Sequence, residues 1–159
     1  MAKKKSNAGQ LISFVSVILG IAALVMLFLP VVQVKEIGTT YSGLNVTFGY
    51  KEKVVVAEAE IFKFSFMNLL TYILAAAGIL FAILSALAKG GKFASFISAV
   101  AFLVAGVFFF LVISFSVLPV EGALGDAFKD TLALAYGSIV GGVASILAGL
   151  GMAYKTFVK

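Results

Sequence analysis

Residues 11–30 read LISFVSVILGIAALVMLFLP, a stretch without a single ionisable side chain. At about 1.5 Å of rise per residue, a helix of this length crosses a hydrocarbon layer about 30 Å thick. Comparable apolar runs follow at residues 66–88, 93–118 and 132–154. One such run also fits a buried helix of a soluble protein, but four exceed what one water-soluble core can bury. The pattern predicts four transmembrane helices.

Composition supports a membrane environment. Of the 159 residues, 62% are hydrophobic and only 12% are charged, and the mean hydropathy is +1.16. Soluble domains are roughly 45–50% apolar and about 25% charged. We therefore expect one membrane domain over residues 1–159, an all-α four-helix bundle.

The first run also has features of a secretory signal peptide, because Lys3, Lys4 and Lys5 precede it. It is longer than the roughly 7–15 apolar residues of a signal peptide. Pro-Val-Val-Gln-Val follows it in place of a small-x-small cleavage site. We expect residues 11–30 to be retained as a helix.

The distribution of lysine predicts the orientation. The connections at residues 31–65 and 119–131 hold every acidic residue of the chain. The two ends and the turn between the second and third runs carry lysine without any acidic residue. Because lysine-rich segments stay on the cytoplasmic side, we expect both termini in the cytoplasm and a multi-pass protein of the plasma membrane. These cytoplasmic lysines are Lys3, Lys4, Lys5, Lys89, Lys92, Lys155 and Lys159.

The connection at residues 31–65 predicts a small extracellular antiparallel β-sheet. An apolar residue recurs at every second position from 44 to 50, as in a half-buried strand. Residues 50–53 would form a polar turn and residues 54–64 a second strand, with residues 31–37 as another. Because two strands alone are marginal in water, we expect the sheet to rest on the second connection, the membrane or a partner.

Small residues recur at every fourth position along the fourth run. In lipid, such residues let helix backbones approach closely. Two alternatives stay open: the stripe holds the chain's own bundle together, or it is a face for another membrane protein or a second copy. The stripe consists of Ala133, Gly137, Gly141, Ser145, Gly149 and Ala153.

The sequence lacks the residues of most catalytic and metal sites. It contains no Cys and no His, the commonest nucleophilic, basic and metal-binding side chains. No Asp, Glu, Lys, Arg or His lies inside a predicted span, which argues against ion-coupled transport. Asp126 and Asp130 could bind Ca²⁺, but the sequence favours a role at the start of the fourth helix. We expect no enzyme activity, no metal, no cofactor and no nucleic-acid partner.

The expected topology resembles that of the claudin family and its four-helix relatives. The first outer loop carries Tyr41-Ser42-Gly43-Leu44-Asn45, which is similar to the aromatic and Gly-Leu-Trp signature of that family. Asn45 stands where the family has its second aromatic residue, and the two disulfide cysteines of the family are absent. The resemblance implies a claudin-like architecture, a membrane bundle with an extracellular sheet, and a fold alone does not carry function.

We therefore expect a non-enzymatic structural or interaction protein that binds another membrane protein or its own copies. The alternative is an accessory subunit, or a small pore component, of a membrane transport complex. Lipid is a partner in both cases. The predicted contact residues are Tyr41, Leu44, Phe48 and Tyr50 in the outer loop and Gly137, Gly141, Ser145 and Gly149 in the fourth helix.

Overall fold

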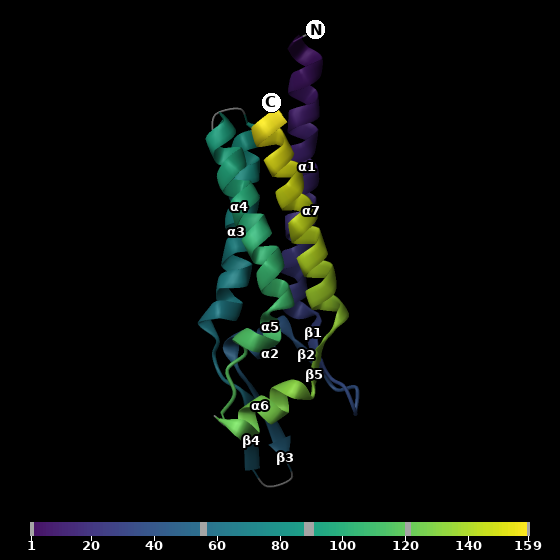
Figure 1. The fold of residues 1–159 in the computed structure, drawn as a ribbon, viewed down its shortest axis with the longest axis vertical. Coiled ribbons are helices and arrows are strands. Elements are labelled where there is room, and N and C mark those ends of the chain that lie inside the picture. Colours follow the sequence, from purple (N-terminus) through teal and green to yellow (C-terminus); the bar gives the residue numbers. More distant parts are fainter. Residues whose placement is uncertain (1, 55–56, 88–90, 120–121, 159) are drawn as a thin grey trace.

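Four long helices run side by side and form the bundle that dominates the molecule (Figure 1). The computed structural model describes residues 2–54, 57–87, 91–119 and 122–158. Within these residues, four helices are long and apolar enough to cross a membrane. By the length and composition of its helices the chain is a multi-pass membrane protein. The four helices are α1 (Ala2–Val25), α3 (Phe66–Ala86), α4 (Gly91–Phe110) and α7 (Tyr136–Val158).

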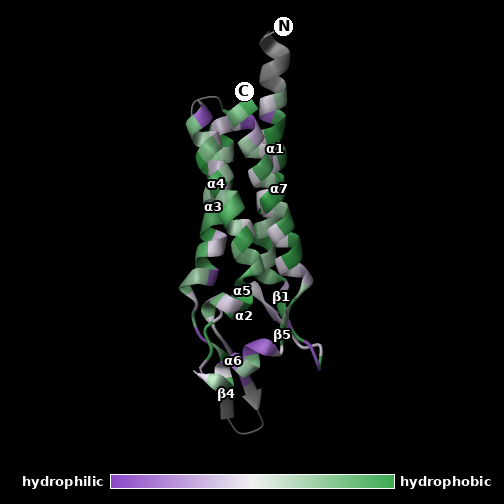
Figure 2. Cartoon of the chain, in the orientation of Figure 1, coloured by the Kyte–Doolittle hydropathy of each residue, from purple (hydrophilic) through white to green (hydrophobic). Residues whose placement is uncertain are grey.

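The two ends of the bundle differ. Both termini lie at one end, which we call the termini end (Figure 1). At the opposite end, the described parts of residues 30–65 and 116–135 form short strands and helices that we call the end layer. Figure 2 shows hydrophobic residues along the helices and hydrophilic residues mainly in the end layer and near the termini end. The polar structure of the chain is therefore concentrated outside the apolar bundle.

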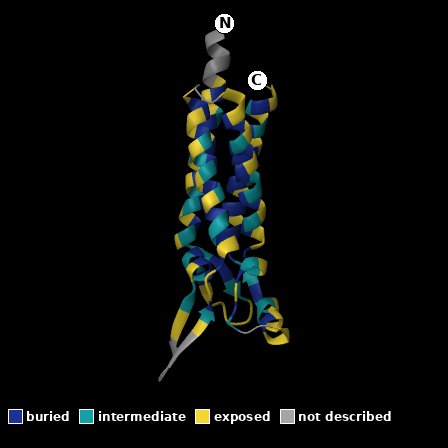
Figure 3. Ribbon diagram, turned by 90° about the vertical axis from the view of Figure 1, so that its left-hand side faces the viewer, coloured by how far each residue is buried: buried dark blue, intermediate teal, exposed yellow. Residues whose placement is uncertain are grey.

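Small residues set how closely the helices pack. Helix α7 packs against α4 and α1, and α3 packs against the same two helices. The buried ring of Phe102 on α4 lies against Gly20 of α1 and Gly78 of α3, where an added Cβ would come within 2.8 Å of ring atoms. Figure 3 shows buried residues facing the bundle interior and exposed residues facing outward. Glycine at these positions allows the close backbone approach typical of membrane bundles.

The helix ends differ from the ends of the apolar runs. The first helix begins at Ala2 and is followed by a 3₁₀ turn, η1 (Met26–Phe28). The helix of the third run stops at Phe110 instead of residue 118, and a short helix, α5 (Val112–Phe115), follows it. The segment after α5 is extended because it pairs with the end layer, where the Lys63 amide donates to the Val117 carbonyl at 2.8 Å. This pairing accounts for the extended backbone after α5, whereas the break between α4 and α5 lies at Leu111.

The end layer contains two small antiparallel sheets. In the first, β1 (Pro30–Val34) lies between β2 (Thr40–Ser42) and β5 (Leu132–Leu134). The second is the hairpin of β3 (Tyr50–Val54) and β4 (Ala57–Phe62), whose register sets Lys51 opposite Glu60 and Lys53 opposite Glu58. Opposite charges at such positions favour this register. The first sheet combines β1 and β2, which lie between α1 and α3, with β5, which lies between α5 and α7. It therefore rests on the second connection of the bundle through β5.

Residues 44–50 do not form the predicted strand, because Gly43–Phe48 is a helix, α2. The Ser42 hydroxyl accepts from the Asn45 amide at 3.3 Å, the hydrogen bond of a helix N-cap. Gly43, Val46 and Thr47 are all buried, and their spacing is that of one helix face. The segment predicted as a polar turn belongs to strand β3, and residues 55–56, which follow it, lie outside the described residues.

The predicted start of the fourth helix at residue 132 is also wrong. Strand β5 occupies that position, held by the Ala135 amide donating to the Val31 carbonyl at 2.9 Å, and α7 begins only at Tyr136. Asp126 therefore does not cap α7. It lies in the first turn of a separate helix, α6 (Ala123–Asp130), where its charge complements the positive helix end.

One hydrophobic core continues from the bundle into the end layer. It includes Phe109 of α4 and Tyr72 of α3 within the bundle, and Val31, Tyr41 and Phe62 within the layer. The rings of Tyr41 and Phe62 meet edge to face with centroids 4.9 Å apart. Because this core is shared, the end layer is seated firmly on the bundle.

Candidate functional site

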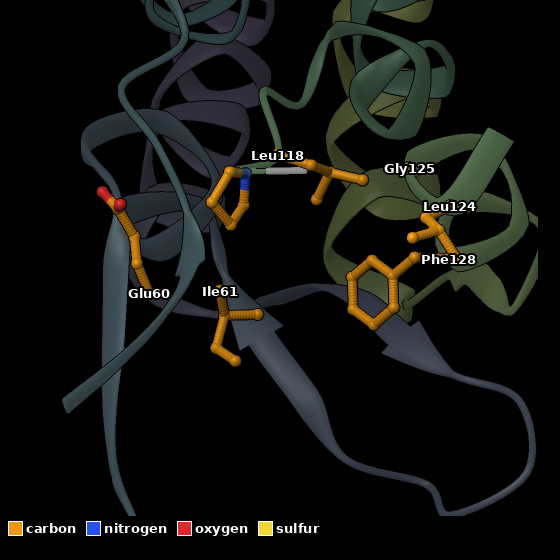
Figure 4. Close-up of a pocket in the computed structure, with 7 residues that line it drawn as sticks. Glu60, Ile61, Leu118, Leu124, Gly125 and Phe128 are labelled. Carbon is orange, nitrogen blue, oxygen red and sulfur yellow. The ribbon is translucent and has the colours of Figure 1, made fainter. Parts of the chain in front are cut away.

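An apolar pocket opens in the end layer between β4 and α6 (Figure 4). Its volume is about 350 Å³. The carboxylate of Glu60 points away from the other side chains in Figure 4, so the walls are apolar. A pocket of this size and composition accepts a bulky apolar group rather than an ion. It is lined by Glu60, Ile61, Leu118, Pro119, Leu124, Gly125 and Phe128.

Helix α6 provides one wall of the pocket. Leu124 and Phe128 lie one turn apart and therefore share a face of the helix, while Gly125 beside them is buried. Phe128 packs toward Phe62, with ring centroids 6.5 Å apart, whereas Leu124 at the rim is 74% exposed. Two long side chains hold α6 in place: Lys129 donates to the Ser114 carbonyl at 3.2 Å, and Lys35 donates to the Asp130 carbonyl at 3.0 Å.

The four predicted contact residues of the loop lie in different environments. Tyr41 is buried against Phe62 and Tyr50, and burial, with a smaller contribution from the negative charge of Glu52, raises the pKa of its hydroxyl. Leu44 and Tyr50 are half-buried. Only Phe48 presents a large exposed apolar surface, at 51%. The structure therefore brings Tyr41 and Tyr50 together in the core of the layer and leaves Phe48 at the surface.

The four predicted contact residues of the fourth helix lie inside the bundle. An added Cβ at Gly141 would come within 2.8 Å of the Phe109 ring, and one at Gly149 within 2.7 Å of Leu103. Gly137 lies against the backbone of Pro30, and Ser145 is fully buried. The stripe therefore faces α4 and the start of β1 of the same chain, which is the first of the two alternatives.

A polar cluster at the termini end was not anticipated from the sequence. The Lys155 ammonium of α7 donates to Ser13 Oγ of α1 at 2.6 Å, and to Ser85 Oγ and the Ser85 carbonyl of α3 at 2.7 and 3.1 Å. Ser85 Oγ in turn hydrogen-bonds to Ser95 Oγ of α4. Lys155 thus joins α7 to α1 and α3 directly, and Ser85 extends the cluster to α4. The available signal was that a serine occurs near the termini end of each neighbouring run.

The proximity of a lysine to serine hydroxyls also occurs in hydrolases with a Ser–Lys pair. Here Ser13 is fully buried and its hydroxyl donates to the Gly9 carbonyl, while Ser85 is 5% exposed. A substrate has no access to either oxygen in this arrangement. Among the described residues, moreover, no group of three carboxylates could hold a metal ion. The geometry of the cluster fits helix association better than chemistry.

Comparison with protein-family models, curated proteins and solved structures gave no significant match. The candidate site is therefore defined by its geometry alone: an apolar pocket with an exposed leucine at its rim, built on a layer that shares its core with the bundle.

Proposed function

We propose that the chain is a non-enzymatic membrane interaction protein that binds another membrane protein, or a second copy of itself, through the pocket between β4 and α6. The observation that carries this proposal is the pocket's apolar wall, with Leu124 74% exposed at its rim. Burying an exposed leucine side chain against a partner is worth roughly 1.5–3 kcal/mol. The shared core supports the proposal further, because a rigid scaffold presents a contact surface at low entropic cost.

The orientation that we propose follows from charge. The termini end is cytoplasmic and the end layer faces outside at the plasma membrane, since the layer carries the acidic residues and the opposite end carries lysine without them. A sheet built from both outer connections also supports the claudin-like architecture implied by the loop sequence. That likeness concerns arrangement and does not identify a partner.

An accessory subunit of a membrane complex is the second candidate, and it is favoured over a pore. The interior of the bundle is filled by Phe102, Phe109 and Met152, all at most 1% exposed. Packed aromatic and thioether side chains leave the bundle axis closed. Within this alternative, the chain would contact a transport protein rather than conduct a solute.

The exposed edge of β3 disfavours one way in which two copies could associate. In the described part of the chain, β3 pairs only with β4. If two copies of the chain paired their β3 strands in an antiparallel arrangement, a two-fold axis would relate the copies. One residue of β3 would then lie opposite the same residue of the second copy. Every such register that pairs three or more residues of β3 is centred on Lys51, Glu52 or Lys53, and so opposes like charges. Self-association through this edge is therefore disfavoured.

The proposal predicts that Leu124→Glu abolishes a native association while Ile37→Glu preserves it. Leu124 and Ile37 are both apolar and similarly exposed, at 74% and 73%, but Ile37 lies outside the pocket. A glutamate at the rim places a charge where an apolar partner group would bind. We expect a loss of about 2 kcal/mol or more, roughly 30-fold in affinity.

The measurement is purification in mild detergent, with the stoichiometry and saturability of each complex determined by light scattering and titration. A foreign chain at fixed stoichiometry supports the accessory subunit, and a defined oligomer supports self-assembly. Retention of every association by Leu124→Glu, or a wild-type chain that is monomeric and without a stoichiometric partner, contradicts the proposal.

A further inference from the structure

Two exposed phenylalanines of the end layer form a pair at its boundary with the bundle. Phe48 at the end of α2 and Phe64 after β4 are each 51% exposed, and their ring centroids lie 6.3 Å apart. The apolar surface continues onto the first turn of α3, where Phe66 is 60% and Met67 is 37% exposed. The pair therefore extends the outward-facing surface of a membrane-crossing helix.

Hydrogen bonds fix the depth of α2 along the bundle. The Ser65 amide donates to the Thr47 carbonyl at 2.8 Å, and Asn68 Nδ2 of α3 donates to the Val46 carbonyl at 3.0 Å. At the other end of α2, Gly43 lies against the Tyr72 hydroxyl of the second turn of α3 and the backbone of Leu27. Helix α2 thus lies at the level of the first two turns of α3, where that span ends.

A buried polar network makes this placement rigid. Ser65 caps α3 by accepting from the Asn68 amide at 3.2 Å, and its hydroxyl donates to the carbonyl of Phe115, the last residue of α5. Asn68 Nδ2 also approaches Ser116 Oγ at 3.3 Å. Because α2, α3 and the segment after α5 share these hydrogen bonds, the phenylalanine pair cannot withdraw from the boundary without breaking them.

We propose that Phe48 and Phe64 anchor the end layer in the lipid interface, with both rings among the headgroups and the upper acyl chains. Phenylalanine is among the apolar residues that interfacial helices bury at the boundary of headgroups and acyl chains, and lysine beside it keeps its ammonium at the headgroups. A hollow of about 250 Å³ beside the pair includes Lys51 and Lys63, together with Glu60, among its lining residues. The lysines suit a lipid phosphate, and the rings suit the acyl region below it.

This assignment gives Phe48 a lipid partner instead of the protein partner predicted from the sequence. It is independent of the pocket between β4 and α6, which contains neither phenylalanine. The anchor would hold the end layer down on the membrane surface and fix the height at which the pocket is presented.

The absence of tryptophan from the chain allows a direct test. Phe48→Trp and Phe64→Trp, reconstituted singly into phosphatidylcholine vesicles, are each expected to show blue-shifted emission. Lipids brominated near the top of the acyl chain should quench both, and aqueous iodide should quench them at least threefold less than an exposed site. Unchanged thermal unfolding in detergent establishes that each variant is folded.

Two further variants calibrate depth. Ile37→Trp, at a 73% exposed site in the turn between β1 and β2, should be quenched by iodide and not by brominated lipid. Val100→Trp, on an exposed face in the middle of α4, should be quenched most by bromine deep in the acyl chain. If Phe48→Trp or Phe64→Trp behaves like Ile37→Trp, the paired lipid anchor is wrong.

Discussion

Gly141→Leu is expected to destabilise the folded chain by about 1–3 kcal/mol or more, the cost of overpacking a filled core. A Cβ alone at this position would lie 2.8–3.0 Å from three atoms of the Phe109 ring. That ring is 1% exposed and meets Tyr72 edge to face at 5.4 Å, so it has little room to move. The leucine would force α7 and α4 apart.

The neighbouring Val140 provides the control. It is 45% exposed on the outward face of α7, where Val140→Leu adds one methylene group against lipid or detergent. Thermal unfolding in mild detergent should therefore show a clear loss of midpoint for Gly141→Leu and almost none for Val140→Leu. Equal midpoints for both variants would mean that the stripe does not pack inside the bundle.

Lys155→Glu is expected to open the termini end of the bundle. The ammonium donates three hydrogen bonds, to two hydroxyl oxygens and to the Ser85 carbonyl near the end of α3. A carboxylate would instead face that carbonyl and the negative end of the helix dipole. The serine hydroxyls can donate to a carboxylate, but the Ser85 carbonyl cannot, so this acceptor loses its partner and faces a like charge. We expect a loss of about 1–3 kcal/mol.

Lys92→Glu is the control for Lys155→Glu. Both variants replace one positive charge by one negative charge at the same end of the bundle. Lys92 is exposed, so its replacement should alter stability only slightly. The readout is the free energy of unfolding in detergent, together with cross-linking between α1 and α3. If the two variants unfold alike, the Lys155 cluster does not hold the helices together.

The four helices were predictable because only lipid accommodates four long apolar runs. The helix at residues 43–48 could not be predicted in the same way, because the alternation of Leu44, Val46, Phe48 and Tyr50 is typical of a strand. The cap from Ser42 favours a helix, and hydrogen bonds from α3 to Val46 and Thr47 settle the choice. The latter contacts join segments distant in sequence, which no local pattern contains.

The same limit applies to the candidate site. The pocket is assembled from β4, the segment after α5, and α6. Helix α6 itself lies in the connection at residues 119–131, for which the sequence pattern predicted no helix or strand. The charge pattern predicts only that Lys155 lies on the cytoplasmic side. Its hydrogen bonds to Ser13 and Ser85 depend on how the helices pack in the folded bundle. Charge and hydropathy predict where a residue lies along the membrane normal, but not which helix it contacts.

The central claim is that the chain crosses the membrane four times with the end layer outside, and thiol labelling on intact cells tests it most directly. The chain has no cysteine, so single variants report without background. Ile37→Cys and Ala127→Cys, at exposed sites of the end layer that do not line the pocket, should react with an impermeant maleimide. Lys92→Cys at the termini end should react only after the membrane is permeabilised. Labelling of Lys92→Cys from outside, or protection of both end-layer cysteines, would contradict the account.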